Sequence, residues 1–347
     1  MYIKKILWAI ALLGLVAAAF FAYYIYNAML APNTAFENEE AYIFISSDAN
    51  YAEVRSQLEP LLNDLDAFDA LAQQKKYVNN LKAGRFVIKK GMNNNQIINS
   101  IRSNNLPVKV SFNNKSSLAD LAGRVSEQIE ADSLSLLEAM EDETFLRKSG
   151  FNEKTALGMY LPNSYELFWN SSAETFRDRM LKEYNRFWNN SRNAKAKAIN
   201  LTRDEVMALA SIVYEESKQA VEQPRVAGVY LNRLKIGMPL QADPTLKFAA
   251  YQLPEYKNTV IKRVLNIHKE IDSPYNTYMN AGLPPGLITM PDISAIDAVL
   301  NAEKHDYYYF AADAKKPGYH KFAKSLAQHN ANARAYQRYL NSQGIMK

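Results

Sequence analysis

An unbroken apolar run from Ile6 to Tyr26 constrains the architecture of this chain more than any other stretch. The run covers about 21 residues, long enough for one helix to cross a hydrocarbon layer of ~30 Å. Cleavable signal peptides usually have shorter apolar regions, so the sequence predicts a retained membrane anchor. Lys4 and Lys5 precede the run, which favours an N-terminus in the cytoplasm. We therefore expect a single-pass protein of the cytoplasmic (inner) membrane, with everything after about Asn27 on the extracytoplasmic, periplasmic side.

The composition narrows the classes of partner and chemistry. A formal net charge of +5 is small for 347 residues. This charge suits an anionic partner such as a membrane surface or a cell-wall polymer. The chain has no basic run interleaved with aromatic residues, so the sequence does not predict binding to nucleic acid. The chain contains no cysteine, which excludes disulfides, thiolate nucleophiles and thiolate metal sites.

The histidines and glycines show no spacing that predicts a cofactor. HExxH and related metal-ligand patterns are absent, as are a Gly-rich phosphate loop and a G-x-S-x-G elbow. We therefore expect no metal and no cofactor. A histidine outside such patterns is usually a satisfied structural residue, and we expect this of His268, His305, His320 and His329.

Patterning predicts an α+β protein with six consecutive parts. These are a cytoplasmic tail (1–5), a transmembrane helix (6–26), a tether (27–40), a small α+β module (41–112), a helical connecting region (113–190) and a mixed α+β C-terminal domain (191–347). In the module, strands are expected at Tyr42–Ile45, Arg85–Ile88 and Val108–Phe112, with helices at Tyr51–Leu62, Phe68–Leu81 and Met92–Arg102.

The connecting region is expected to contain helices at Ser117–Ile129, Ser133–Glu143 and Thr175–Trp188. Between the second and third, Gly158–Trp169 is rich in aromatic residues, and Pro162 favours a turn that presents polar side chains between rings. Such a segment suits sugar binding, because pyranose rings have apolar faces and polar edges. Packing against the next helix explains the same residues equally well.

A candidate catalytic residue lies at the end of the helix expected after Thr202. Thr202 and Glu205 have the spacing of a capping box. Apolar residues then recur at three- and four-residue steps, and Glu216 continues that stripe, so its side chain should face protein. The helix dipole and partial burial both raise the pKa of a carboxyl group there. Glu216 is therefore a candidate general acid, although adjacent Glu215 and Glu216 also fit a solvated helix end.

Polar loops follow this helix. A second helix is expected at Arg225–Lys235, and the three segments after it are rich in Asn, Gln, Asp, Thr, Tyr and Pro: Gln241–Thr245, Ser273–Tyr278 and Gly282–Gly286. This profile indicates a polar cleft built from stiffened loops. The chain is expected to end with a helix at Asp292–Ala302, a hairpin of Tyr307–Ala311 and Tyr319–Ala323, and a helix at Ala327–Gln343.

Several motifs in the C-terminal half occur in the order and spacing of a known family. They are ALASIVYEES, RVAGVYLNRLKIGMPLQADPT, SPYNTY, AGLPPG, and YYYFAAD followed by HKFAKSLAQHN. The chain closely resembles the endolytic murein transglycosylase family (MltG or YceG-like) from about Gly158 to its end, and resembles it in outline before that. By this resemblance, residues 41–112 correspond to a LysM-like subdomain and residues 191–347 to the YceG-like catalytic domain.

The resemblance implies a membrane-anchored peptidoglycan lytic transglycosylase. It would cleave internal bonds between N-acetylmuramic acid and N-acetylglucosamine in nascent glycan strands and leave 1,6-anhydromuramic ends. The family's catalytic Glu lies sixteen residues before the Asn of its N-R-L motif, and counting back from Asn232 gives Glu216. Glu216 would protonate the leaving oxygen and then accept the proton of the C6 hydroxyl, so one carboxyl group suffices.

The resemblance also implies substrate-binding residues. Asn232, Gln241, Asn276 and Tyr278 are candidates for holding N-acetyl and hydroxyl groups, and Asp243 is a further candidate. As the first residue of an Asp-Pro turn, Asp243 is expected to be structural; in the cleft it would permit hydrolysis. The competing hypotheses are a non-catalytic wall-binding or assembly scaffold and a hydrolase that leaves reducing ends. Peptidoglycan synthases are the expected protein partners.

Overall fold

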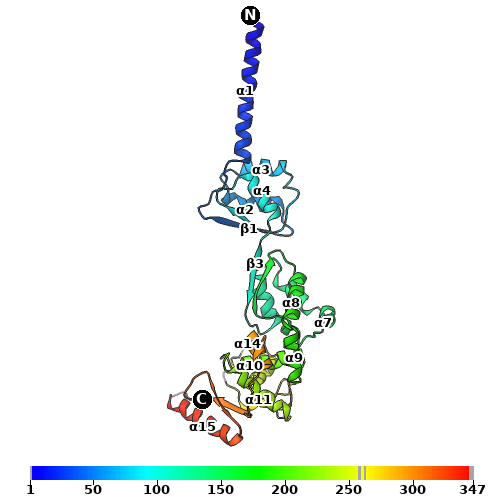
Figure 1. Cartoon of the computed structure of the whole chain (residues 1–347), viewed down its shortest axis with the longest axis vertical. Helices are drawn as coiled ribbons and strands as arrows, with labels where there is room; N and C mark the ends of the chain where they lie inside the picture. The colour runs from blue at the N-terminus through cyan, green and yellow to red at the C-terminus, as the bar shows by residue number, and fades with distance from the viewer. Residues whose placement is uncertain (1, 257–258, 262, 344–347) are drawn as a thin grey trace. The chain divides into compact units, whose positions relative to one another are not determined.

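The computed structural model describes residues 2–256, 259–261 and 263–343 as a mixed α+β protein (Figure 1). The chain forms two compact units. The first comprises Met1–Val110, Ser126–Ala131 and Tyr165–Ser172, and the second Ser111–Val125, Asp132–Ser164 and Ala173–Lys347. The mixed α+β class expected from the sequence is confirmed.

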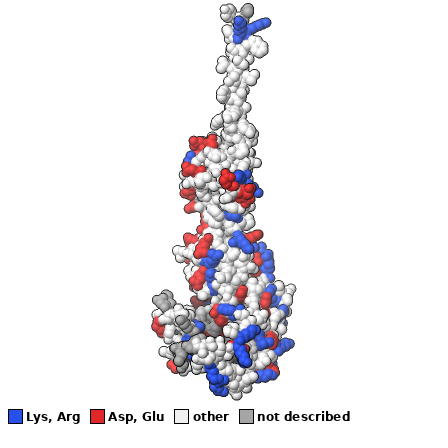
Figure 2. Space-filling model, turned by 90° about the vertical axis from the view of Figure 1, so that its left-hand side faces the viewer, with Lys and Arg blue, Asp and Glu red and all other residues white. Residues whose placement is uncertain are grey.

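The apolar run forms helix α1 (Tyr2–Met29). On the face shown in Figure 2, charged side chains appear only at its N-terminal end, where Lys4 and Lys5 occur in the sequence, and the sequence from Ile6 to Met29 contains no charged residue. By length and composition, α1 could cross a membrane. Its last turn belongs to the first unit, because Ala28 is buried and its carbonyl oxygen accepts a hydrogen bond from Asn94 Nδ2 at 2.9 Å.

The segment that follows α1 is held against the first unit. Asn33 is buried, its Nδ2 donates to Asn94 Oδ1 at 2.6 Å, and its backbone N–H donates to Met92 O at 2.9 Å. Ala35 N donates to Leu61 O at 2.8 Å. The stretch expected as a tether therefore contains backbone and side-chain hydrogen bonds to the module.

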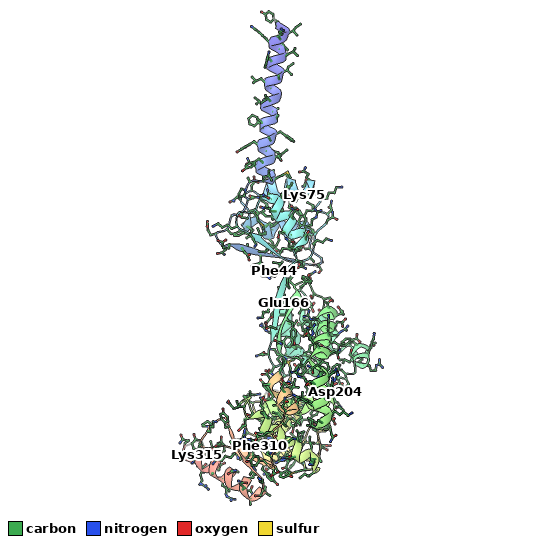
Figure 3. All side chains as sticks on the ribbon, viewed as in Figure 1. Phe44, Lys75, Glu166, Asp204, Phe310 and Lys315 are labelled. Carbon is green, nitrogen blue, oxygen red and sulfur yellow. The ribbon has the colours of Figure 1, made fainter. Side chains whose placement is uncertain are left out.

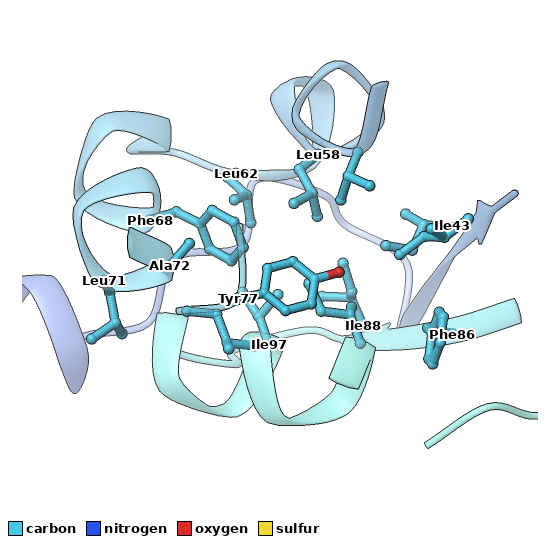
Figure 4. Close-up of a cluster of buried hydrophobic side chains, with 14 residues drawn as sticks. Ile43, Leu58, Leu62, Phe68, Leu71, Ala72, Tyr77, Phe86, Ile88 and Ile97 are labelled. Carbon is cyan, nitrogen blue, oxygen red and sulfur yellow. The ribbon is translucent and has the colours of Figure 1, made fainter. Parts of the chain in front are cut away.

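The expected strand pair of the module is confirmed. Strands β1 (Glu40–Ile45) and β2 (Gly84–Lys89) pair antiparallel, with Ile43 opposite Phe86. The intervening and following helices cover one buried apolar cluster, in which Figure 4 shows Tyr77 among aliphatic and phenylalanine side chains. These helices are α2 (Tyr51–Leu58), the 3-10 turn η1 (Glu59–Leu61), α3 (Leu65–Gln74) and α4 (Asn94–Ser103).

The helix expected at Phe68–Leu81 ends early, and that prediction was wrong for its second half. Lys76 takes a positive φ of 57°, Lys76 N donates to Gln73 O at 2.9 Å, and Tyr77 N donates to Ala72 O at 2.8 Å. This is the Schellman arrangement that ends helices. This turn directs the Tyr77 ring, which is 0% exposed, into the core, and the burial of the ring stabilises the early helix end.

Two expectations for the connecting region also need correction. The segment expected as a polar turn forms β4 (Asn163–Phe168), which pairs with β3 (Pro107–Phe112). Just before it, Tyr160 is fully buried and stacks on Phe176 at 6.1 Å, so core packing explains this aromatic residue. The helix expected to reach Glu143 instead breaks at Asp142, whose carboxylate accepts hydrogen bonds from the first amides of the next helix.

The second unit is built around α10 (Arg203–Glu216), which packs on α11 (Gln223–Lys235), α12 (Asp243–Tyr251) and α14 (Ile293–Leu300) (Figure 1). Gly228 lets α11 approach the chain after α14, since a Cβ there would overlap the Glu303 carbonyl oxygen. The other helices are α5 (Leu118–Ser126), α6 (Ser133–Glu141), α7 (Glu143–Ser149), η2 (Ala156–Met159), α8 (Ala173–Phe187), α9 (Asn190–Ala198), η3 (Pro254–Tyr256) and α13 (Asn266–Lys269).

The C-terminal hairpin and helix are confirmed. Strands β5 (Tyr309–Ala312) and β6 (His320–Ala323) pair antiparallel, with Phe310 opposite Phe322. Helix α15 (Leu326–Ser342) follows and packs against both strands.

Candidate active site

Helix α10 carries Glu216 as its last residue. The predicted capping box is present: Thr202 N donates to Glu205 Oε2 at 2.7 Å, and Glu205 N donates to Thr202 Oγ1 at 3.2 Å. Every residue from Val206 to Val213 is buried, so the helix position is fixed by packing on several sides. Because the helix ends at Glu216, that carboxyl group lies at the negative end of the helix dipole.

Glu216 opens into a cavity of about 310 Å³. Four of the residues selected from the sequence line it together: Glu216, Gln241, Asp243 and Tyr278. The remaining lining residues come from α11, the loop after it, β5 and α15: Tyr230, Arg233, Leu240, Tyr309, Phe310, Leu326 and His329. Phe310 is labelled on its strand in Figure 3.

The pKa of the Glu216 carboxyl group lies close to neutral pH. Burial raises its pKa from the ordinary 4.5 to about 7, and the negative charge of Asp243 adds to the increase. A hydrogen bond from Tyr230, together with the charges of His320 and Arg233, favours the carboxylate and limits the rise. Burial is the largest of these effects, so Glu216 holds a proton over much of the range below neutral pH.

Tyr230 is the direct partner of that carboxyl group. Its hydroxyl donates to Glu216 Oε1 at 2.7 Å, and the residue is only 1% exposed. The ring packs edge-on against Phe310, with centroids 5.8 Å apart. Since the phenol is held by packing, it fixes the orientation of the carboxyl group and leaves the other oxygen, Oε2, without a hydrogen bond to the described part of the chain.

Asp243 and Tyr278 form a second polar part of the lining. Tyr278 Oη donates to Asp243 Oδ1 at 2.6 Å. Burial, followed by this contact with a carboxylate, raises the pKa of Tyr278 well above its ordinary range, so the phenol stays protonated. Asp243 is exposed and is the first residue of α12, where the helix dipole favours its charge.

Asn276 supports this part of the lining and does not reach the cavity. It is fully buried, and its Nδ2 donates to the carbonyl oxygens of Lys269 and Ile271 at 2.9 and 2.8 Å. Its Oδ1 accepts from Tyr278 N at 3.0 Å. Asn276 therefore holds the backbone that presents Tyr278.

Asn232 likewise lies outside the lining. Its Nδ2 donates to His305 O at 2.8 Å and to Tyr307 O at 3.0 Å. The next residue, Arg233, is buried and donates to Tyr308 O at 2.6 Å and Leu240 O at 2.7 Å. These neighbours in the N-R-L motif tie α11 to the segment just before β5 and to the loop before α12, and Arg233 also brings a positive charge to the cavity wall.

His329 is a cavity residue that sequence reasoning assigned to structure alone. Its ring stacks on Tyr309 with centroids 5.4 Å apart, and its buried Nδ1 has no hydrogen-bond partner within the described ranges. Burial, with the nearby charge of Arg233, lowers the pKa of His329, so the ring is neutral near pH 7. No local pattern marks this residue, because the contact depends on how α15 packs beside β5.

The other histidines have hydrogen-bond partners, as expected. His320 connects β6 to the end of α10: its Nδ1 lies 2.8 Å from Glu222 Oε2, which also accepts from Ser217 Oγ at 3.1 Å. Burial raises the pKa of Glu222, but the hydrogen bonds from His320 and Ser217 outweigh it and the net pKa is lowered. This buried contact fixes the residue that directly follows Glu216.

Comparison with known proteins gives concordant matches. A family model described as the YceG-like family matches residues 43–335. The endolytic murein transglycosylase of Bacillus subtilis is 30% identical over 284 residues, which is 77% of this chain and 75% of that protein. The endolytic murein transglycosylase of Streptococcus pneumoniae is 26% identical over 91% of this chain, which spans only 62% of that relative. A crystal structure of a yceG-like protein from Listeria monocytogenes matches with a TM-score of 0.56 and 26% identity, covering 85% of this chain and 99% of that one.

Proposed function

The chain belongs to the YceG-like family, and from this membership we propose that it is a peptidoglycan lytic transglycosylase that cleaves glycan strands internally. The name of the Bacillus subtilis relative supports the reaction and the substrate. The observation that carries the proposal for this chain is one carboxyl group, Glu216, with a pKa near 7 in a polar cavity. A group that changes protonation near neutral pH is suited to donate a proton and then accept one.

In the proposed reaction, Glu216 acts twice. As an acid it protonates the oxygen that links N-acetylmuramic acid to N-acetylglucosamine, and the bond from muramic C1 to that oxygen breaks. As a carboxylate it then accepts the proton of the C6 hydroxyl, whose oxygen closes onto C1 to give the 1,6-anhydro ring. The proton lost in the first step is regained in the second, so no water is consumed.

Tyr230 and Asp243 have supporting roles in this proposal. The hydrogen bond from Tyr230 stabilises the carboxylate form that exists between the two steps. Asp243 places a negative charge in the same cavity, where it favours both the protonated form of Glu216 and the positive charge that develops at C1. Tyr278 holds that carboxylate in place.

Hydrolysis is the second candidate reaction, and it is supported by the presence of Asp243 in the same cavity as Glu216. Two carboxyl groups lining one cavity are the arrangement that glycosidases use to activate water. The two reactions differ in their product, because a hydrolase leaves a reducing end that contains a solvent oxygen. Mass spectrometry of digests made in ¹⁸O-water separates them.

We further propose that α1 anchors the enzyme in the cytoplasmic membrane, with the N-terminus inside and the chain after α1 outside. Lys4 and Lys5 near the N-terminal end of α1, followed by a stretch without charged side chains from Ile6 to Met29, support this orientation. The module at residues 41–112 would be a LysM-like glycan-binding element, which its β1-α2-α3-β2 order supports. An anchored enzyme of this kind would act on nascent strands beside peptidoglycan synthases.

The test uses the full chain in detergent and purified peptidoglycan. Wild-type protein is expected to release fragments with anhydromuramic ends, and Glu216→Gln, which keeps the shape but cannot donate the proton, is expected to release none. Glycan binding by both proteins without any product would support the scaffold hypothesis instead. Unchanged product formation by Glu216→Gln would reject Glu216 as the acid.

A further inference from the structure

A second cavity, of about 300 Å³, adjoins the one that contains Glu216. Glu215 and Pro244 line it, whereas their chain neighbours Glu216 and Asp243 line the first cavity. Adjacent Cα atoms are only ~3.8 Å apart. The two cavities therefore lie close together, near the end of α10 and the start of α12.

One face of α12 forms most of this second cavity. Pro244, Lys247, Phe248 and Tyr251 follow the three- and four-residue spacing of a single helix face and all line it. The opposite face of the helix is buried in the core of the unit through residues such as Leu246 and Ala250. The exposed face thus presents one cation and two aromatic rings from a rigid support.

Lys247 is an unpaired cation in this cavity. Its side chain is half-buried, yet it makes no ion pair or hydrogen bond with the described part of the chain. The acidic residue in the lining, Glu215, is already engaged, since its Oε1 lies 2.9 Å from Lys218 Nζ. An ammonium without a counter-ion beside a cavity is available to pair with an anionic ligand.

The aromatic residues provide a platform beside the cation. Phe248 is held by Tyr275, with ring centroids 4.6 Å apart, and Tyr251 remains 41% exposed. Ser116 and Thr289 add hydroxyl groups to the lining, and Thr289 Oγ1 also donates to Lys115 O at 3.2 Å. A cavity with a cation, apolar ring faces and hydroxyl groups suits an acidic peptide better than a neutral sugar alone.

We propose that this cavity, the Lys247 pocket, binds the stem peptide of the glycan strand, with a stem carboxylate paired to Lys247. The inference rests on the proposed function, because it takes peptidoglycan as the substrate of the adjoining cavity. Stem peptides are attached to muramic acid along the strand and carry free carboxylates. A strand with its scissile bond at Glu216 would place a stem close to the neighbouring pocket, so the enzyme would prefer strands that retain their stems.

The test compares glycan strands that carry stem peptides with strands from which an amidase has removed them. The proteins are full-length wild type, Lys247→Ala, Lys247→Glu and the control Lys197→Ala, which removes an exposed lysine of α9 outside the pocket. We expect Lys247→Ala to reduce kcat/KM on stem-bearing strands about three- to tenfold, mainly through KM, and Lys247→Glu to reduce it further. Stripped strands should be cleaved equally by all four proteins.

The same proteins are then tested for binding to both kinds of strand in the Glu216→Gln background. If wild type cleaves both substrates and Lys247→Ala matches Lys197→Ala on each, the inference is overturned while the proposed function stands. An equal loss on stripped and stem-bearing strands also overturns it, because a stem contact cannot act without a stem. If the protein with native Glu216 cleaves neither substrate, but binding of stem-bearing strands in the Glu216→Gln background still depends on Lys247, the pocket is supported and the proposed reaction is rejected.

Discussion

Replacing Glu216 with Gln should change how the stability of the protein depends on pH, whatever reaction the site performs. The pKa of Glu216 is raised from 4.5 to about 7 in the folded state, so between these values the folded chain holds a proton that the unfolded chain has released. The free energy of unfolding therefore decreases as pH rises through this window. A glutamine side chain at this position has nearly the same shape and can still accept the hydrogen bond of Tyr230, but it does not titrate.

The size of the effect follows from the pKa difference. A difference of about 2.5 in pKa, at about 1.36 kcal/mol per pKa unit, corresponds to at most ~3.4 kcal/mol. Because the carboxyl group lines an open cavity and is partly exposed, we expect about 2 kcal/mol. Relative to wild type, Glu216→Gln should gain this amount of stability between about pH 4.5 and about pH 8.

Urea denaturation at a series of pH values, followed by tryptophan fluorescence, measures this difference. Other titrating groups affect both proteins equally, so the difference between the two curves isolates Glu216. A difference that stays constant across this pH range would refute the argument that burial raises the pKa of this carboxyl group. A difference that changes in the opposite direction would mean that charge pairing outweighs burial.

Three further changes test other parts of the structure. Tyr230→Phe removes the hydrogen bond that favours the carboxylate of Glu216, so the alkaline limb of the kcat/KM profile should move up by about one pH unit; an unmoved limb would show that the phenol does not tune the acid. Gly228→Ala should lower the free energy of unfolding by about 1–3 kcal/mol, because its methyl group meets a backbone carbonyl, whereas the control Gly123→Ala, in an open helical position, should raise it by about 0.5–1 kcal/mol in the same denaturation assay. His329→Ala should raise KM for glycan with little change in thermal stability, because the ring lines the cavity and its Nδ1 has no partner to lose among the described residues; a large drop in Tm with unchanged KM would make it a packing residue only.

Local signals explain which parts of the site could be predicted from the sequence. The capping box at Thr202 and the apolar stripe of α10 both act within a few residues, and they located the helix that ends at Glu216. The β5–β6 hairpin was likewise predictable, since its strands are close in sequence and have strong β-propensity. The raised pKa of Glu216 followed from the same stripe, which indicated burial before any tertiary contact was known.

The errors share a physical cause, because each depends on contacts between distant residues. Lys76 adopts a left-handed conformation so that Tyr77 can reach the core, and nothing in the local pattern marks that helix end. Residues 163–168 look like a turn until β3 is present to pair with them. Asn276 was predicted to hold substrate, yet its side-chain amide donates to the carbonyl oxygens of Lys269 and Ile271. Composition identifies polar residues, but it does not show which of them already have hydrogen-bond partners within the folded chain.

The hydrogen bond from Asn94 to the carbonyl oxygen of Ala28 limits where the chain can be truncated without destabilising the first unit. A truncation after α1 would leave the buried Asn94 amide without its acceptor and would remove the apolar contact that Ala28 makes. If α1 lies in a bilayer, this contact connects the helix to the module without a flexible linker. A rotation of the helix about its axis therefore turns the module with it. The anchor then controls the orientation of the module as well as its location.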